Sequence, residues 1–161
     1  MKSQNQYPNT QVPKYPTGGE LGGFHDARGE EEFWGEDGAA AGFREEFRLT
    51  KPYDLEERTA QFGEAIIRFA KKIPRSPVND RLISQLVGAG TSVGANYCEA
   101  DDGVSRKDYM NRIGTCKKEA RESKFFLRMI AVAEERLKPE ARVLWLEARE
   151  LHLIFCSIFR K

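Results

Sequence analysis

The chain has 161 residues, 40% of them hydrophobic, with 26 basic and 25 acidic side chains and a formal net charge of +1. This length suits one ordinary domain with its own core, and the balanced charge excludes a global bias toward nucleic acid or membranes. Its three widely spaced cysteines form no disulfide framework, which favours a cytoplasmic, reducing location. The sequence also has no run of 18 apolar residues and no apolar stretch typical of a signal peptide at its N-terminus.

The first 50 residues are predicted to form a disordered, acidic tail rich in Gly and Pro, followed by a folded domain over residues 51–161. Residues 1–48 hold five basic and nine acidic residues, with eight of the fourteen glycines and three of the seven prolines. Such a segment buries too little apolar surface to offset its ordering entropy. Its seven aromatic residues leave two interpretations open, unstructured residues or contacts for a partner, in which case part of the tail would form a turn of helix on binding.

An amphipathic helix is predicted between Pro52 and Pro74. Asp54 is expected to cap its start, and Pro74 and Pro77 are expected to end it. The apolar side chains recur at alternating spacings of four and three residues, which places them on one face. These residues are Leu55, Thr59, Phe62, Ile66, Phe69 and Ile73.

A second helix, over about residues 79–101, carries many small residues. Gly90 and Gly94 are four apart and share a face, which lets a neighbouring helix backbone come close. Asn96 and Glu99 lie one turn further on, and either face solvent or are buried with a basic partner such as Arg81 or Arg112. The residues assigned to helix packing and assembly are Gly90, Gly94, Asn96 and Glu99.

A third helix is expected to follow a left-handed turn at Gly103, with Ser105 as its N-cap. Its apolar side again alternates spacings of four and three, over Tyr109, Ile113, Cys116, Ala120, Ser123, Leu127 and Ile130. The fourth helix has Pro139 in its first turn and is apolar nearly all round near its end. Because residues 49–161 show no strand-like alternation, we predict an all-α, antiparallel up-down-up-down four-helix bundle.

One side of the third helix carries a row of basic residues with offsets of 4, 7 and 11, which places them within about 60° of one another. The row consists of Lys117, Arg121, Lys124 and Arg128, with Arg106, Lys107, Arg112 and Lys118 nearby. Two interpretations stay open. The row is a solvated face with partners such as Glu119 and Glu122, or it is a stripe that binds nucleic-acid phosphates.

No catalytic constellation, metal-site spacing or phosphate-binding loop is recognisable. Cys98, Cys116 and Cys156 are odd in number and far apart, so we expect small core residues rather than disulfides. His152, the only histidine in residues 51–161, is expected to be structural. We therefore expect no enzyme activity, no cofactor and no metal site.

The segment "QLVGAGTSVGANYCEADDGVSRKDYMNRIGTCKKEARESKFFLRMI" resembles the four-helix-bundle proteins encoded in intervening sequences of bacterial 23S rRNA genes. The matching residues are Ser92-Val93-Gly94-Ala95-Asn96, Glu99-Ala100 and Ser105-Arg106-Lys107-Asp108-Tyr109. The opening "YDLEERTAQFGEAIIRFAKKIP" also matches, so the resemblance covers roughly residues 51–160 and leaves residues 1–48 outside it.

This resemblance implies a left-handed four-helix bundle that assembles into homopentamers. It also points to a related protein, the accessory protein of diversity-generating retroelements, which is a basic pentamer that binds nucleic acid and a reverse transcriptase. Two functions therefore remain open: a nucleic-acid-binding accessory oligomer, with RNA or DNA and a reverse transcriptase as partners, or a structural adaptor oligomer that binds another protein.

Overall fold

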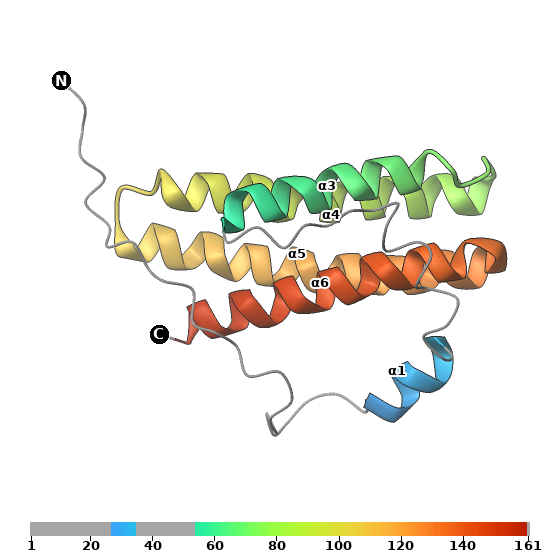
Figure 1. The fold of residues 1–161 in the computed structure, drawn as a ribbon. Helices are drawn as coiled ribbons and strands as arrows, with labels where there is room; N and C mark the ends of the chain where they lie inside the picture. Colours follow the sequence, from blue (N-terminus) through green and yellow to red (C-terminus); the bar gives the residue numbers. More distant parts are fainter. Residues whose placement is uncertain (1–26, 35–53, 161) are drawn as a thin grey trace.

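The computed structural model describes residues 27–34 and 54–160, and all of its regular elements are helical (Figure 1). The elements in chain order are α1 (Ala27–Trp34), α3 (Leu55–Ala70), α4 (Pro77–Asp101), α5 (Arg106–Ala133), the short 3-10 helix η2 (Glu135–Leu137) and α6 (Lys138–Phe159).

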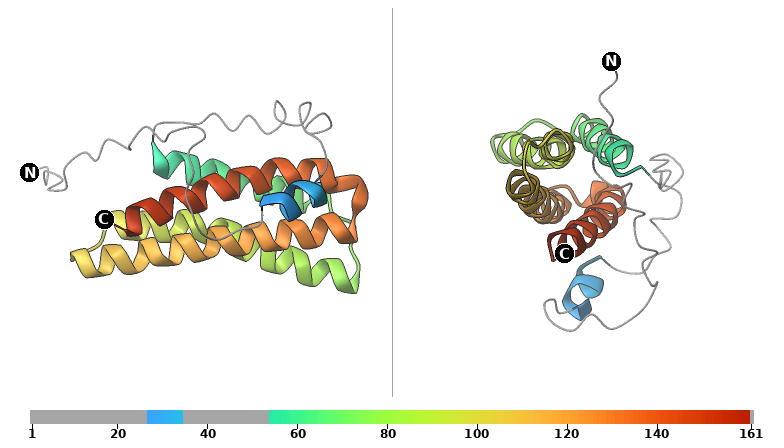
Figure 2. Two further views of the ribbon diagram at one scale, coloured as in Figure 1. Left: turned by 90° about the horizontal axis from the view of Figure 1, so that it is seen from below. Right: turned by 90° about the vertical axis from the view of Figure 1, so that its left-hand side faces the viewer.

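The four long helices α3 to α6 run alternately up and down and lie side by side. Seen end-on, they occupy the corners of a square, so that each helix packs against the two that flank it (Figure 2). The short helix α1 lies outside this square, next to α6. The predicted all-α bundle is therefore confirmed for the described residues.

Local sequence signals set the helix starts. The Asp54 carboxylate accepts a hydrogen bond of 2.9 Å from the backbone N–H of Glu56, and the Ser105 hydroxyl accepts one of 3.1 Å from that of Asp108. Both satisfy N–H groups that have no partner inside the first helical turn. Helix α4 begins slightly earlier than predicted, at Pro77, because Ser76 supplies the cap.

The core follows the predicted periodicity. Five of the six predicted apolar-face residues lie in α3 and are buried, and so is Ile73, in the turn after that helix. On α5, six of the seven are buried and Tyr109 is half-buried. Of the three cysteines, Cys116 is buried as expected and Cys156 is intermediate. Cys98 is exposed, contrary to our prediction, because it lies on the outer side of α4 beside Glu56.

The small residues of α4 serve its contact with α3. A Cβ atom added at Gly90 would lie 2.8 Å from the Cγ1 atom of the fully buried Ile66. One added at Gly94 would lie 3.4 Å from the Thr59 carbonyl oxygen. A Cβ atom at Gly90 would therefore clash with Ile66, whereas one at Gly94 would make an ordinary van der Waals contact. The packing part of the interpretation is confirmed at Gly90.

Helices α3 and α6 are joined by charged groups as well as by apolar contacts. The Arg58 guanidinium donates two hydrogen bonds to the nearly buried Glu147 carboxylate, at 2.6 and 3.0 Å, and a third to Glu150. Two-point contact with a carboxylate suits the planar guanidinium. Loss of Arg58 would leave Glu147 as an uncompensated buried charge, which typically costs about 3–5 kcal/mol.

One prediction about the N-terminal segment and one about the turn between α4 and α5 are wrong. Residues 27–34, placed in the disordered tail, form helix α1, and its Trp34 belongs to the core. The remaining residues of the predicted tail, 1–26 and 35–50, lie outside the described residues. Gly103 does not adopt a left-handed conformation; its N–H donates to the Ala100 carbonyl, and a Cβ atom there would lie 2.9 Å from that oxygen. Close approach, not positive φ, makes glycine suitable at this turn.

We expect Gly90→Ala to destabilise the bundle by about 1–3 kcal/mol, because Ile66 or the α3 backbone must shift to admit the new methyl group. Gly88→Ala is the matched control: a Cβ atom there meets nothing within 4 Å, so it should stabilise helix α4 by up to about 1 kcal/mol. Urea unfolding measures both free energies. Equal effects of the two substitutions would contradict the close α3–α4 contact.

Candidate functional site

Lys124 is the least exposed member of the predicted basic row. Only 9% of the residue is exposed, and its ammonium group lies 4.5 Å from the ring centroid of Trp145 and 3.4 Å from a carboxylate oxygen of Glu30. Burial lowers the pKa of Lys124, and Glu30 partly offsets that effect. Lys124 is thus covered by other side chains of the protein, and the prediction that it lies on a solvated face is wrong.

Lys117 is the first residue of the row and is half-buried. Its ammonium group lies 4.3 Å from the centroid of the Phe159 ring, near the end of α6. Its backbone carbonyl lies 3.0 Å from Nδ1 of His152. Because a carbonyl oxygen only accepts, Nδ1 carries the proton and donates. His152 therefore links α6 to α5, as expected of a structural histidine.

Arg128 also has an aromatic partner, since its guanidinium carbon lies 4.4 Å from the centroid of Phe33 on α1. Arg121, between Lys117 and Lys124 on the same side, is exposed. Three further basic residues of the predicted set are exposed on α5: Arg106, Lys107 and Lys118. Lys118 makes a loose ion pair of 3.8 Å with Glu122 on its own helix.

Arg112 does not belong to this side of α5. It points to α4, where its guanidinium forms an ion pair of 2.6 Å with Glu99 and donates a hydrogen bond of 3.2 Å to the side-chain oxygen of Asn96. The expected basic partner of Asn96 and Glu99 is therefore present. Asn96 is half-buried, and Glu99 is exposed. These three residues link α4 to α5 rather than forming part of a binding face.

Helix α1 covers part of the basic side. Its Glu30, Phe33 and Trp34 are spaced i, i+3 and i+4, so they share one face of the helix. Phe33 lies against Arg128 and also 4.7 Å from the ammonium group of Lys138. Trp34 packs against Trp145, with 5.6 Å between ring centroids. We call the surface formed by Lys124, Arg128, Lys138 and Trp145 the α1-binding face.

Docking explains why α1 is a helix at all. Eight residues are too few for a helix to be stable alone in water, because nucleation is costly. Trp34 is only 7% exposed, and burial of one large apolar side chain contributes about 1.5–3 kcal/mol. The composition of this segment predicts disorder because it has few aliphatic residues. Composition alone does not show that two adjacent aromatic rings have a complementary surface on the bundle. The i, i+3 and i+4 spacing of Glu30, Phe33 and Trp34 was the signal that the sequence offered.

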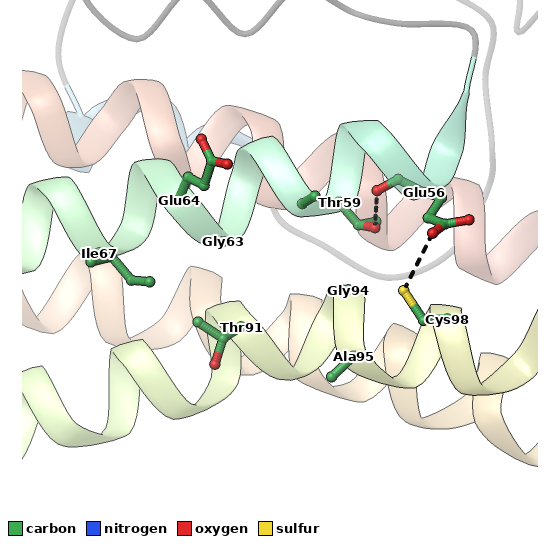
Figure 3. A pocket seen from close by; sticks show the side chains of 10 residues that line it. Glu56, Thr59, Gly63, Glu64, Ile67, Thr91, Gly94, Ala95 and Cys98 are labelled. Carbon is green, nitrogen blue, oxygen red and sulfur yellow. Dashed lines mark hydrogen bonds between the residues drawn. The ribbon is translucent and has the colours of Figure 1, made fainter.

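A shallow groove lies between α3 and α4, on the outer side of the close contact (Figure 3). Its volume is about 300 Å³. The lining is mostly small or apolar, with Gly63 and Ile67 from α3 and Gly94 and Ala95 from α4, while Glu56 and Cys98 stand at one end. Partial desolvation and the nearby Glu56 carboxylate raise the pKa of the Cys98 thiol, which disfavours the reactive thiolate. Nothing in this groove resembles a catalytic arrangement.

Among the described residues, no group of three or more His, Cys, Asp or Glu side chains is placed to hold a metal ion. None of the described helices is long and apolar enough to span a bilayer.

No protein-family model and no curated protein matches the sequence. The fold is similar to the crystal structure of a protein of unknown function from the S23 ribosomal protein family of Bacteroides thetaiotaomicron VPI-5482. The TM-score is 0.58 at 24% sequence identity, over 66% of this chain and 95% of that chain. This similarity concerns the fold and is consistent with the resemblance found in the sequence.

Partial burial of His152 predicts a pH-dependent stability. Desolvation lowers the pKa of His152 in the folded chain below its ordinary value of 6.5. As pH falls below that ordinary value, the unfolded chain binds a proton that the folded chain does not, so stability decreases until the lowered folded pKa is reached. We expect His152→Gln, which keeps a donor for the Lys117 carbonyl, to lose less stability between about pH 7.5 and about pH 5. Urea unfolding at both pH values tests this, and equal losses in both proteins would contradict it.

Proposed function

We propose that this protein is a non-enzymatic, homo-oligomeric four-helix bundle that binds nucleic acid through the basic side of α5. The observation that carries the proposal is the exposure of four basic residues within a sector of about 120° on that helix. These are Arg106, Lys107, Lys118 and Arg121. Core packing does not require them, and their charge suits the phosphates of a nucleic-acid backbone.

One exposed aromatic ring on the neighbouring helix, beside Lys117, supports the same proposal. Phe159 is 41% exposed, and Lys117 lies over its ring. Proteins that bind single-stranded nucleic acid combine a basic surface with aromatic faces on which bases stack. The proposed site therefore consists of the four exposed basic residues together with Lys117 and Phe159. Lys124 and Arg128 would join it only when α1 leaves its face.

An adaptor function that involves a protein partner is the second candidate. The observation that favours it is α1 itself, an acidic and aromatic helix seated on this side of the bundle. A surface that already accommodates such a helix is suited to protein recognition as well as to phosphate binding.

For the assembly, we propose a homopentamer, as the family resemblance implies. Two features of the described residues support self-association. Phe125 and Val132 are 57% and 66% exposed, and their spacing of seven residues places them on one side of α5. The α3–α4 groove offers a small-residue surface to which a helix of a second copy can come close. A ring would also repeat the basic side of α5 around its axis and so enlarge it.

The direct test of nucleic-acid binding is a fluorescence-anisotropy titration with single-stranded RNA and duplex DNA at two salt concentrations. Binding should be largely independent of sequence and weaken with salt, with a log–log slope near −0.9 per phosphate contact on duplex and about −0.7 on single strands. Replacing Arg106, Lys107, Lys118 and Arg121 by Glu should abolish binding and leave the fold intact, since all four are exposed.

The control variant replaces four other exposed basic residues by Glu, so its change in charge is the same. They lie at the end of α3, in the turn that follows and in the first turns of α4: Arg68, Lys71, Arg75 and Arg81. It should retain clearly tighter binding than the first variant. If the two variants bind alike, or if the unmodified protein does not bind at low salt, the nucleic-acid proposal fails and the adaptor function takes its place.

Native mass spectrometry at micromolar concentration tests the assembly. We expect a complex of five copies of the 18.4 kDa chain. Replacing Phe125 and Val132 by Ser should shift the distribution to smaller species if they lie in the interface. A chain that stays monomeric at this concentration would contradict the proposed ring.

A further inference from the structure

The α1-binding face has the composition of a peptide-recognition site. Its floor is the buried Trp145 ring, which contacts both Lys124 and Trp34. Arg128 of α5 and Lys138 of α6 both lie against Phe33, with their charges 4.4 and 4.7 Å from its ring centroid. An apolar floor with cationic sides suits a ligand that is both acidic and aromatic.

The resident helix matches this face through three side chains. Glu30 pairs with Lys124, Phe33 contacts both Arg128 and Lys138, and Trp34 packs on the Trp145 ring. Their i, i+3 and i+4 spacing is the pattern by which short amphipathic helices anchor in grooves. The sequence of α1, ARGEEEFW, holds three glutamates before the two aromatic residues, so its charge complements that of the face.

The contact is also small. Helix α1 has only eight residues and folds where it docks. A short segment of this kind, held mainly by proximity to its site, can be displaced by a similar ligand at sufficient concentration. Among the residues that the structure describes, most of the core lies among α3, α4, α5 and α6, and Trp34 is the one buried core residue that α1 contributes.

We propose that the α1-binding face is a recognition site for a short acidic helix ending in aromatic residues, presented by a partner protein, and that α1 is its resident occupant. The partner helix would place a carboxylate on Lys124 and two adjacent aromatic rings on Arg128, Lys138 and Trp145. Access requires displacement of α1, so partner binding and α1 docking exclude each other.

The test uses the full-length chain and a fluorescein-labelled peptide of residues 24–37 as the acidic, aromatic probe. In the receptor variant Glu30→Lys, Phe33→Ala and Trp34→Ala, the resident helix can no longer compete. We expect the peptide to bind this variant at least about tenfold more tightly than the unmodified chain, whose own α1 competes at a high effective concentration. A peptide with the same three substitutions should not bind.

A matched receptor adds Arg128→Ala and Lys138→Ala to the same variant and should lose peptide binding while keeping its helical content by circular dichroism. If the triple variant unfolds, Phe33→Ala alone serves as the receptor, with a smaller expected gain. The inference is overturned if the peptide does not bind the folded receptor, or binds equally without Arg128 and Lys138.

Nucleic acid is the competing ligand for this face, and a separate oligonucleotide titration of the same receptor decides between them. A gain in oligonucleotide affinity without peptide binding would overturn the inference and leave α1 as a cover over a phosphate-binding surface. Peptide binding without oligonucleotide binding supports the inference and removes the proposed nucleic-acid function, so the two proposals fail separately.

Discussion

The buried ammonium group of Lys124 constrains how this side of the protein is built. Only 9% of this lysine is exposed, so its charge needs partners within the protein in place of water. It finds the Trp145 ring on α6 and the Glu30 carboxylate on α1. Glu30 lies 94 residues away in sequence, so this ion pair connects a separate segment to the bundle. Phe33 and Trp34 of the same segment pack on the adjacent surface.

The basic side of α5 therefore has two parts with different properties. Toward the start of the helix, Arg106, Lys107, Lys118 and Arg121 are exposed. Toward its end, Lys124 and Arg128 are engaged with α1. A ligand that binds only the first part can do so while α1 stays docked. A ligand that needs the second must replace α1, and the chemistry of α1 indicates what such a ligand resembles.

Most of the bundle could be predicted because its helices carry strong local signals. The alternating spacings of four and three identified the buried faces of α3 and α5, and Asp54, Ser105 and Pro139 marked helix starts. The α1-binding face could not be predicted in this way. Periodicity places Lys124 close to the apolar face of α5, but it does not show whether the side chain is exposed. The contact with the Trp145 ring on α6, which buries the side chain, is visible only in the tertiary structure. Likewise, the sequence predicts a left-handed conformation at Gly103. In the structure, the close approach of the Ala100 carbonyl oxygen is what excludes a side chain there.

Hydrogen exchange at residues 27–34 tests the central claim, that α1 is held on α5 and α6 by Lys124, Trp145 and their neighbours. In the unmodified full-length chain, the amides of these residues should exchange measurably more slowly than in a peptide of the same sequence, because docking maintains the helical hydrogen bonds. Lys124→Ala should remove much of that protection while α3 to α6 stay protected. Exchange at residues 27–34 as fast as in the free peptide would contradict the account.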